Sequence, residues 1–161
     1  ELFIPPKKGK SHVLRIIREL LEFRPKSNRT NLSEALKFLS SVMKKKAIVF
    51  VLSDFIAEDY EKTLKISGNK HDLTGIRVYD HREEEIPNLG MVQIQDAETG
   101  KYQLVNTQSK SVRRAYGSYY RERVDYFSDT FKKSGCGVIS CRVDESYVKK
   151  LLGYLKKIKK I

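Results

Sequence analysis

One uncharged, apolar segment constrains the fold of this chain more than any other. Residues 47–53 read Ala-Ile-Val-Phe-Val-Leu-Ser and are followed by Asp54 and Phe55. β-Branched and aromatic residues favour strands, and a strand without charges is typical of one buried on both faces. We therefore expect 47–53 at the centre of a parallel sheet. Its end at Asp54 places a carboxylate at the carboxyl edge, where open α/β folds bind ligands.

A hydroxyl is expected near the same edge. Thr30 precedes Asn31 and Glu34, which form a capping-box-like start of the helix that leads into the strand. Thr30 and Asp54 are therefore candidates for one site. The local pattern is also compatible with plainer roles, in which Asp54 caps the following helix and Thr30 is a turn residue.

Hydrophobic periodicity places helices and strands in alternation along the chain. Helices are expected over 11–24, 31–43, 58–70, 109–133 and 145–159, and core strands over 47–53, 73–79 and 137–143. A β-hairpin is expected from 91–95 and 102–105, turned by residues 96–100. This order predicts an α/β fold with a Rossmann-like parallel sheet flanked by helices and an inserted hairpin. Because sheets usually have about five or six strands, we expect one or two more strands upstream of Glu1.

The chain is strongly basic, with 32 Lys and Arg against 20 Asp and Glu and a net charge of +12. That balance permits a nucleic acid, an anionic membrane surface or an acidic partner. The basic residues are spread along the chain and carry no known nucleic-acid motif, so a solvated surface is favoured. The final basic helix is amphipathic and suits either the sheet or a membrane, and packing on the sheet is favoured. No signal peptide or membrane-spanning run is visible.

Sequence motifs favour a binding domain over an enzyme. No nucleophile elbow, Gly-rich phosphate loop or zinc-ligand spacing occurs. Cys136 and Cys141 lie an odd number of residues apart around a strand, so their side chains should face opposite ways and stay reduced. The three histidines show no partner pattern and are expected at the surface or at helix starts. Ser53-Asp54-Phe55 is similar to an aspartate-nucleophile phosphatase, but Ile56 stands where those enzymes have a second Asp.

The order of Thr30, helix, strand and Asp54 resembles a von Willebrand factor A-like domain. Those domains bind a divalent cation through an Asp-x-Ser-x-Ser loop, a later Thr and a last Asp. Thr30 and Asp54 resemble the last two of these ligands by position. The sequence departs from the family in two respects, since no Asp-x-Ser-x-Ser occurs and Phe55 stands where the family often has Gly. The resemblance implies a partial metal site. Since Mg²⁺ needs more oxygen ligands, no cofactor is expected in this chain, with Mg²⁺ only in a longer form.

Several motifs in order resemble the bacterial domain-of-unknown-function family fifty-eight, which has a von Willebrand A-like domain. They are residues 3–10, 30–36, 48–55 ending in Ser-Asp-Phe, 78–87 with Asp-x-Arg-Glu-x-Glu-Ile-Pro, 112–116 and 144–148. The resemblance implies one domain over 1–161, lacking the strand that carries Asp-x-Ser-x-Ser. It further implies a MoxR-type AAA+ ATPase as partner, in assembly or maturation of complexes. Relatives often have membrane anchors, so we expect the cytoplasm or the cytoplasmic face of a membrane.

The acidic turn after strand 73–79 is a second candidate site. Asp80, Arg82, Glu83 and Glu85 could form a binding patch beside Asp54, or a solvated loop in which Arg82 offsets its neighbours. The sequence thus predicts a non-enzymatic protein-interaction domain. The alternative is a basic module for nucleic acid or an anionic membrane surface. Self-association is expected, because strand 47–53 is too apolar to remain unpaired.

Overall fold

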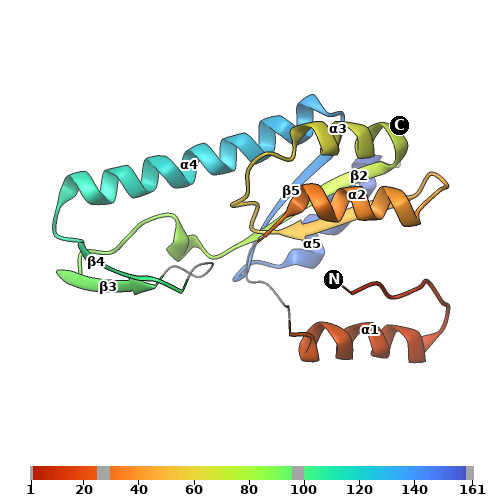
Figure 1. Cartoon of the computed structure of the whole chain (residues 1–161), viewed down its shortest axis with the longest axis horizontal. Coiled ribbons are helices and arrows are strands. Elements are labelled where there is room, and N and C mark those ends of the chain that lie inside the picture. The colour runs from red at the N-terminus through yellow and green to blue at the C-terminus, as the bar shows by residue number, and fades with distance from the viewer. Residues whose placement is uncertain (1, 25–29, 96–99, 159–161) are drawn as a thin grey trace.

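The computed structural model describes residues 2–24, 30–95 and 100–158. Figure 1 shows its elements. They are α1 (Lys10–Glu22), α2 (Leu32–Val42), β1 (Ile48–Ser53), α3 (Glu61–Lys70), β2 (Asp72–Tyr79), the short 3₁₀ helix η1 (His81–Glu83), β3 (Met91–Gln95), β4 (Tyr102–Asn106), α4 (Lys110–Lys133), β5 (Gly137–Arg142) and α5 (Tyr147–Ile158). The predicted order of elements is confirmed, while residues 96–99 of the predicted hairpin turn lie outside the described ranges.

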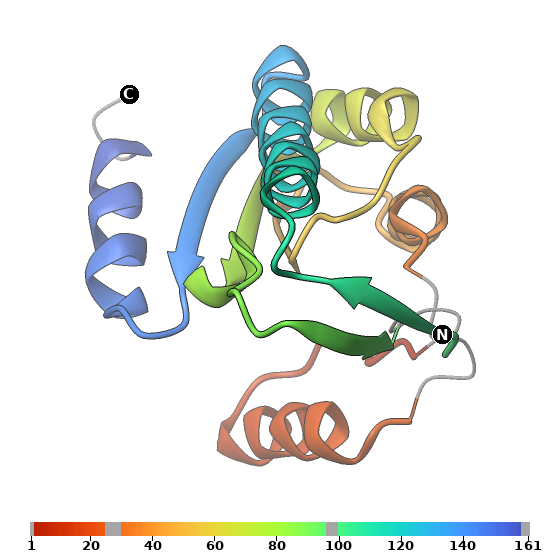
Figure 2. The same ribbon diagram turned by 90° about the vertical axis from the view of Figure 1, so that its left-hand side faces the viewer.

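A parallel three-stranded sheet forms the centre of the molecule, with strand order β1-β2-β5. Phe50 lies opposite Thr74, and Thr74 lies opposite Gly137. Helices α2, α3 and α4 lie on one face and α5 on the other (Figure 2). The antiparallel pair β3–β4 forms a separate hairpin. The α/β class is therefore confirmed, and the sheet flanked by helices is consistent with a partial Rossmann-like fold.

The main core fills the space between the sheet and helices α2, α3 and α4. Phe55, Phe127 and Phe131 are buried there in mutual aromatic contact, and Tyr60 packs edge-on against Phe131. Gly75 of β2 permits this close approach, because a Cβ at Gly75 would lie 2.5 Å from the Phe131 ring. The sheet and α4 are thus packed more closely than a larger residue would allow.

The opposite face of the sheet is only partly covered. Helix α5 packs Leu151 and Tyr154 over a small cluster of Ile76, Ile139 and Cys141. The predicted packing of the final helix on the sheet is therefore confirmed. The two cysteines are free, and they belong to different core clusters. This arrangement agrees with the expectation that they face opposite ways.

The expected central position of strand 47–53 is wrong in the described part of the chain. β2 is central instead, and β1 is an edge strand. Alternate β1 side chains point away from the main core, so that Ile48 is 71% and Leu52 67% exposed. The absence of charged residues shows that a strand favours apolar surroundings. It does not show whether other strands pair with both edges of that strand, or whether both of its faces are covered.

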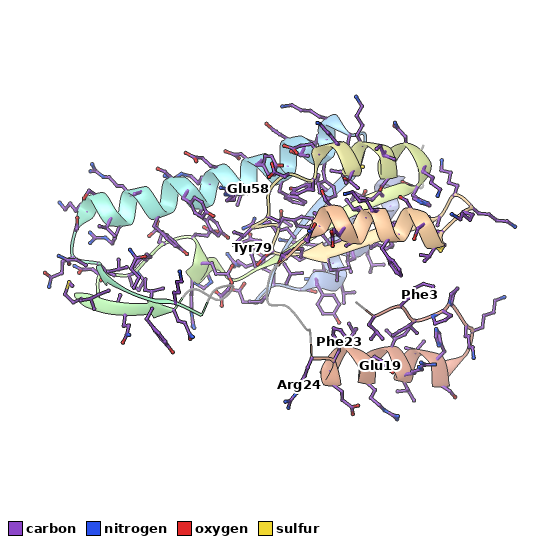
Figure 3. The ribbon with its side chains drawn as sticks, in the orientation of Figure 1. Phe3, Glu19, Phe23, Arg24, Glu58 and Tyr79 are labelled. Atoms are coloured by element: carbon purple, nitrogen blue, oxygen red, sulfur yellow. The ribbon has the colours of Figure 1, made fainter. Side chains whose placement is uncertain are left out.

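Helix α1 lies apart from the sheet (Figure 2) and has no buried residue. Its apolar side chains Leu20 and Leu21 are exposed. Phe3 precedes the helix and lies on the side of α1 that faces the rest of the molecule (Figure 3), where its ring contacts Phe38 of α2 edge-on at 6.0 Å between centroids. No helix in the described ranges has the length and apolar character needed to cross a membrane.

Candidate binding surfaces at the sheet edge and the hairpin

Each strand of the parallel sheet is followed by a carboxylate at the same edge. Asp54 follows β1, Asp80 follows β2, and Asp144 with Glu145 follow β5. The last two are held by cations, because Arg142 pairs with both and Lys150 pairs with Glu145. The hydrogen bond from Arg142 lowers the pKa of Asp144 below its ordinary value. The carboxyl edge is therefore acidic but locally neutralised at β5.

Asp54 stabilises the turn that ends β1. Its Oδ1 accepts a hydrogen bond from the Ile56 backbone N–H at 3.2 Å and one from the Ser53 hydroxyl at 3.3 Å. Phe55, between them, has φ 58° and its ring stacks on Phe127. Helix α3 starts only at Glu61, so Asp54 caps its own turn and not the following helix.

Thr30 is exposed and directly precedes Asn31, whose side chain accepts the Glu34 backbone N–H at 3.0 Å. The predicted cap of α2 is confirmed by this bond. Ser33 donates a hydrogen bond to the Asp59 carbonyl at 2.7 Å, so the start of α2 lies beside the loop that follows β1. Within the described ranges, however, no hydrogen bond joins Thr30 to Asp54.

Thr30 and Asp54 do not by themselves fit a magnesium ion. Mg²⁺ requires near-octahedral oxygen ligands, usually with one or two carboxylates and several waters. One oxygen of Asp54 is already engaged by its own turn. In the described part of the chain, no group of three or more His, Cys, Asp or Glu side chains could hold a metal ion. Their role as metal ligands stays a prediction.

The acidic turn after β2 is ordered by its own residues. Asp80 caps η1 by accepting the Arg82 backbone N–H at 2.9 Å, and its carboxylate lies 3.3 Å from the His81 ring. The Glu83 carbonyl accepts the Tyr116 hydroxyl of α4 at 2.8 Å. Burial raises the pKa of Tyr116, which keeps this donor protonated. Among described residues Arg82 forms no ion pair, so it does not offset its neighbours by direct contact.

Glu85 lies in the wall of a basic cavity that the sequence did not predict as a site. The cavity has a volume of about 390 Å³ and lies between the acidic turn and α4. Its other lining residues are Ile86, Lys110, Arg113, Arg114, Gly117 and Arg121. The signal was present in the sequence, because positions 110, 113, 114, 117 and 121 share one face of a helix. From the sequence alone, these basic residues are interpreted as part of a solvated surface, so no site is predicted here.

A second, more apolar cavity lies between α4 and the hairpin. It has a volume of about 770 Å³, and its apolar lining is Ile86, Ile94, Leu104, Val105, Val112 and Tyr116. Around it the hairpin region exposes large hydrophobic side chains. They are Leu89, Met91, Ile94, Tyr102 and Leu104.

Comparisons with known proteins give one family and several uncharacterized relatives. Residues 1–125 match the family described as "Protein of unknown function DUF58". The uncharacterized protein MAV169 of Mycobacterium avium is 24% identical over 135 residues, which cover 82% of this chain and 78% of that protein. The uncharacterized proteins Rv1480 of Mycobacterium tuberculosis and Mb1516 of Mycobacterium bovis are 27% identical over 100 residues, 60% of this chain. The matched region spans only 32% of each of these two proteins. No solved structure matches the chain.

Proposed function

This chain belongs to the DUF58 family, and from that membership we propose that it is a von Willebrand A-like, non-enzymatic protein-interaction domain. Its partner in this proposal is a MoxR-type AAA+ ATPase, and the shared task is assembly or maturation of other complexes. The observation that carries the proposal is the exposed apolar surface of the β3–β4 hairpin, which projects beyond the sheet under α4 (Figure 1). Large apolar side chains exposed together on one element are typical of interaction sites.

Hydrogen bonds anchor the base of the hairpin to α4 and to the segment before β3. Thr107 is fully buried at its base, where its hydroxyl donates to the Gly90 carbonyl at 2.7 Å and accepts the Leu89 N–H at 2.9 Å. Arg113 of α4 donates to the Thr107 and Gln108 carbonyls at 2.6 and 2.9 Å. A surface whose shape is fixed before binding loses less conformational entropy when the partner arrives.

The proposal assigns no catalytic residue and no cofactor to the described residues. Metal-dependent binding is proposed only for a longer form of the protein, in which further oxygen ligands would join Thr30 and Asp54. The proposal places the domain in the cytoplasm or at the cytoplasmic face of the membrane. The two free, buried cysteines support this placement, because cytosolic proteins keep thiols reduced.

The test measures binding of the purified chain to the MoxR-type ATPase of the same organism by biolayer interferometry. The variant Tyr102→Ser/Leu104→Ser removes two hairpin side chains that are 64% and 65% exposed. The matched control Ile66→Ser/Tyr147→Ser removes side chains that are 65% and 63% exposed elsewhere. We expect the hairpin variant to bind at least about tenfold more weakly, since a few central apolar residues dominate interfaces. Equal weakening by both variants, or no binding of the ATPase, would contradict the proposal.

The net charge of +12 favours one alternative, a basic module for nucleic acid or an anionic membrane surface. Counterion release would then make binding to an oligonucleotide or to anionic vesicles fall steeply with salt. Tight, salt-sensitive binding of these probes, without binding of the ATPase, would select the alternative. The hairpin proposal expects the ATPase to bind and these anionic probes to bind weakly.

A further inference from the structure

We propose that the basic cavity between the acidic turn and α4 binds the carboxylates of an acidic peptide segment, with apolar residues of the same segment in the neighbouring cavity beside the hairpin. This inference rests on the proposed function, because it names the chemistry by which the domain would recognise a protein partner.

The basic cavity carries an excess of uncompensated positive charge. Four cations line it, Lys110, Arg113, Arg114 and Arg121, against the single carboxylate of Glu85. None of the four forms an ion pair within the described ranges. Arg113 instead donates to backbone carbonyls, and Arg121 donates to the Ser118 hydroxyl at 3.3 Å. Neutral acceptors orient these guanidinium groups without neutralising them, so the cavity retains its attraction for an anion.

The backbone of α4 adds to this attraction and leaves room for a ligand. Lys110 is the first residue of α4, and the exposed N–H groups of a helix start favour negative charge. Gly117 lies at the cavity wall, where a Cβ would be 3.3 Å from Arg121 Nη1 and 3.8 Å from the Glu84 carbonyl. The absence of a side chain at Gly117 therefore keeps this space open between helix and turn.

The size and surroundings of the cavity favour a peptide over a nucleic acid. Ile86 lines both the basic and the apolar cavity, so one ligand can contact both. Their volumes of about 390 and 770 Å³ lie in the range of ordinary ligand sites. A segment that alternates carboxylates with apolar side chains matches both cavities.

A neighbouring cavity lacks this positive excess. It has a volume of about 240 Å³ and includes Arg121 together with the buried Arg77, which donates a hydrogen bond to the Tyr120 hydroxyl. Three carboxylates also line it, Glu84, Glu85 and Asp125. Of these two cavities that share Arg121, only the one toward the start of α4 has a positive excess.

The experiment measures fluorescence anisotropy of a labelled peptide, Leu-Glu-Glu-Leu-Glu-Glu-Leu, with the whole chain. The control peptide has Gln in place of every Glu. Lys110→Glu/Arg114→Glu reverses two exposed cations of the cavity, and Lys7→Glu/Lys8→Glu reverses two exposed cations before α1. Both variants lower the net charge equally, so they separate a local site from the general field. Leu104→Ser removes a side chain of the apolar cavity and should weaken acidic-peptide binding at least about threefold, and unchanged binding would overturn the role of that cavity.

We expect the acidic peptide to bind and the Gln peptide to bind at least about tenfold more weakly. Lys110→Glu/Arg114→Glu should weaken acidic-peptide binding about tenfold or more, whereas Lys7→Glu/Lys8→Glu should change it less than about threefold, since distant charges are screened. Equal effects of the two variants would overturn the inference. Stronger binding of a single-stranded oligodeoxynucleotide that is lost in Lys110→Glu/Arg114→Glu would also overturn it.

The same variants separate this inference from the proposed function. If the ATPase binds normally to Lys110→Glu/Arg114→Glu but weakly to Tyr102→Ser/Leu104→Ser, the interaction domain stands and the acidic-peptide site fails. If the acidic peptide binds at the cavity and the ATPase does not bind at all, the site stands and the partner is wrong.

Discussion

Phe55 combines a backbone conformation that favours glycine with a side chain that the core requires. Its φ is 58°, in the left-handed region, which costs a residue with a Cβ about 1–2 kcal/mol. Its ring is buried and stacks on Phe127 with centroids 4.1 Å apart. Here the aromatic contact offsets the backbone cost.

Two substitutions of Phe55 separate these opposing contributions. Phe55→Ala should lower the free energy of unfolding by about 3–5 kcal/mol, because it empties the aromatic cluster. Phe55→Gly loses the same ring but relieves the positive φ, so it should be about 1 kcal/mol less destabilising than Phe55→Ala. Urea denaturation of both variants measures the difference. If Phe55→Gly is the less stable of the two, the left-handed conformation at Phe55 is wrong.

His71 departs from the expectation that the histidines lie at the surface or at helix starts. It ends α3, is only 2% exposed, and neither ring nitrogen has a hydrogen-bond partner in the described part of the chain. Burial and the adjacent Lys70 both lower its pKa. The folded protein therefore holds His71 neutral at a pH where the unfolded chain, with a pKa of about 6.5, takes up a proton.

His71 should therefore make stability depend on pH. Its contribution is fully present above about pH 6.5 and is lost as the pH falls below that value toward the lowered folded-state pKa. The free energy of unfolding from urea titrations should decrease between about pH 6.5 and pH 5. His71→Phe should flatten this part of the curve, and the control His12→Gln should not. An unchanged slope in His71→Phe would show that other groups cause it.

At the scale of single elements, local sequence signals were enough to place most helices and strands. Asn31 and Glu34 indicated the start of α2. The two hairpin strands were predicted from the alternation of apolar and polar residues and from the turn-forming residues between the strands. These signals depend only on residues close together in the chain, so they can be recognised in the sequence alone.

What the sequence could not provide was the assembly of distant elements. The uncharged pattern of residues 47–53 predicted a central strand, but edge or centre depends on which other strands pair with it. The basic cavity joins Glu85 to Lys110 and Arg121 through the packing of the turn against α4. Thr30 and Asp54 were predicted near one edge, and the Ser33–Asp59 hydrogen bond places their segments side by side. Their separation in the sequence could neither predict nor exclude direct contact between Thr30 and Asp54.

Two glycines in different elements predict opposite outcomes for the same substitution. Gly117→Ala should stabilise α4 by about 0.5–1 kcal/mol, because Gly costs helix propensity and its nearest new contact is the flexible end of Arg121. Gly75→Ala should destabilise by about 1–3 kcal/mol, because a Cβ would meet the Phe131 and Phe127 rings at 2.5 and 2.8 Å. Thermal unfolding compares both variants with the parent. A shift of the same sign in both would contradict the packing described for β2 and α4.

For the whole molecule, magnesium should have no specific effect on stability. A ligand present at about 100 times its Kd adds about 2.7 kcal/mol to the folded state. Thr30 and Asp54 supply too few ligands for such binding, so magnesium chloride should shift Tm no more than sodium chloride of equal ionic strength. Differential scanning fluorimetry measures both. A specific shift that disappears in Asp54→Asn would show that the described residues do bind the ion.

The open edge of β1 predicts self-association of the chain. The Ala47 carbonyl accepts the Asp72 N–H of β2 at 2.9 Å, so alternation along the strand directs the backbone groups of Ile48, Phe50 and Leu52 away from β2. The strand contains neither charge nor proline, the features that usually protect an edge. The apolar side chains of these three residues are exposed beside the open edge.

A second copy of this chain fits that edge in one antiparallel register. Centred on Phe50, it places Ile48 opposite Leu52 of the second copy and keeps the apolar side chains on one face of a continuous sheet. Lys46 then lies opposite Asp54 of the second copy, so opposite charges meet at both ends. The net charge of +12 opposes association, but exposed charges are screened within about 8–10 Å at physiological salt.

Light scattering coupled to gel filtration should therefore find a dimer or a larger species. Ile48→Lys/Leu52→Lys places lysines opposite one another in this register, so it should give a monomer. Val148→Lys/Leu152→Lys is the matched control, since these two side chains of α5 are also exposed and lie away from the β1 edge. It adds the same charge and should leave the association intact. A monomeric parent chain at concentrations of about 100 μM would refute the prediction, because burial of three apolar side chains at about 25 cal/mol per Å² should exceed the screened repulsion.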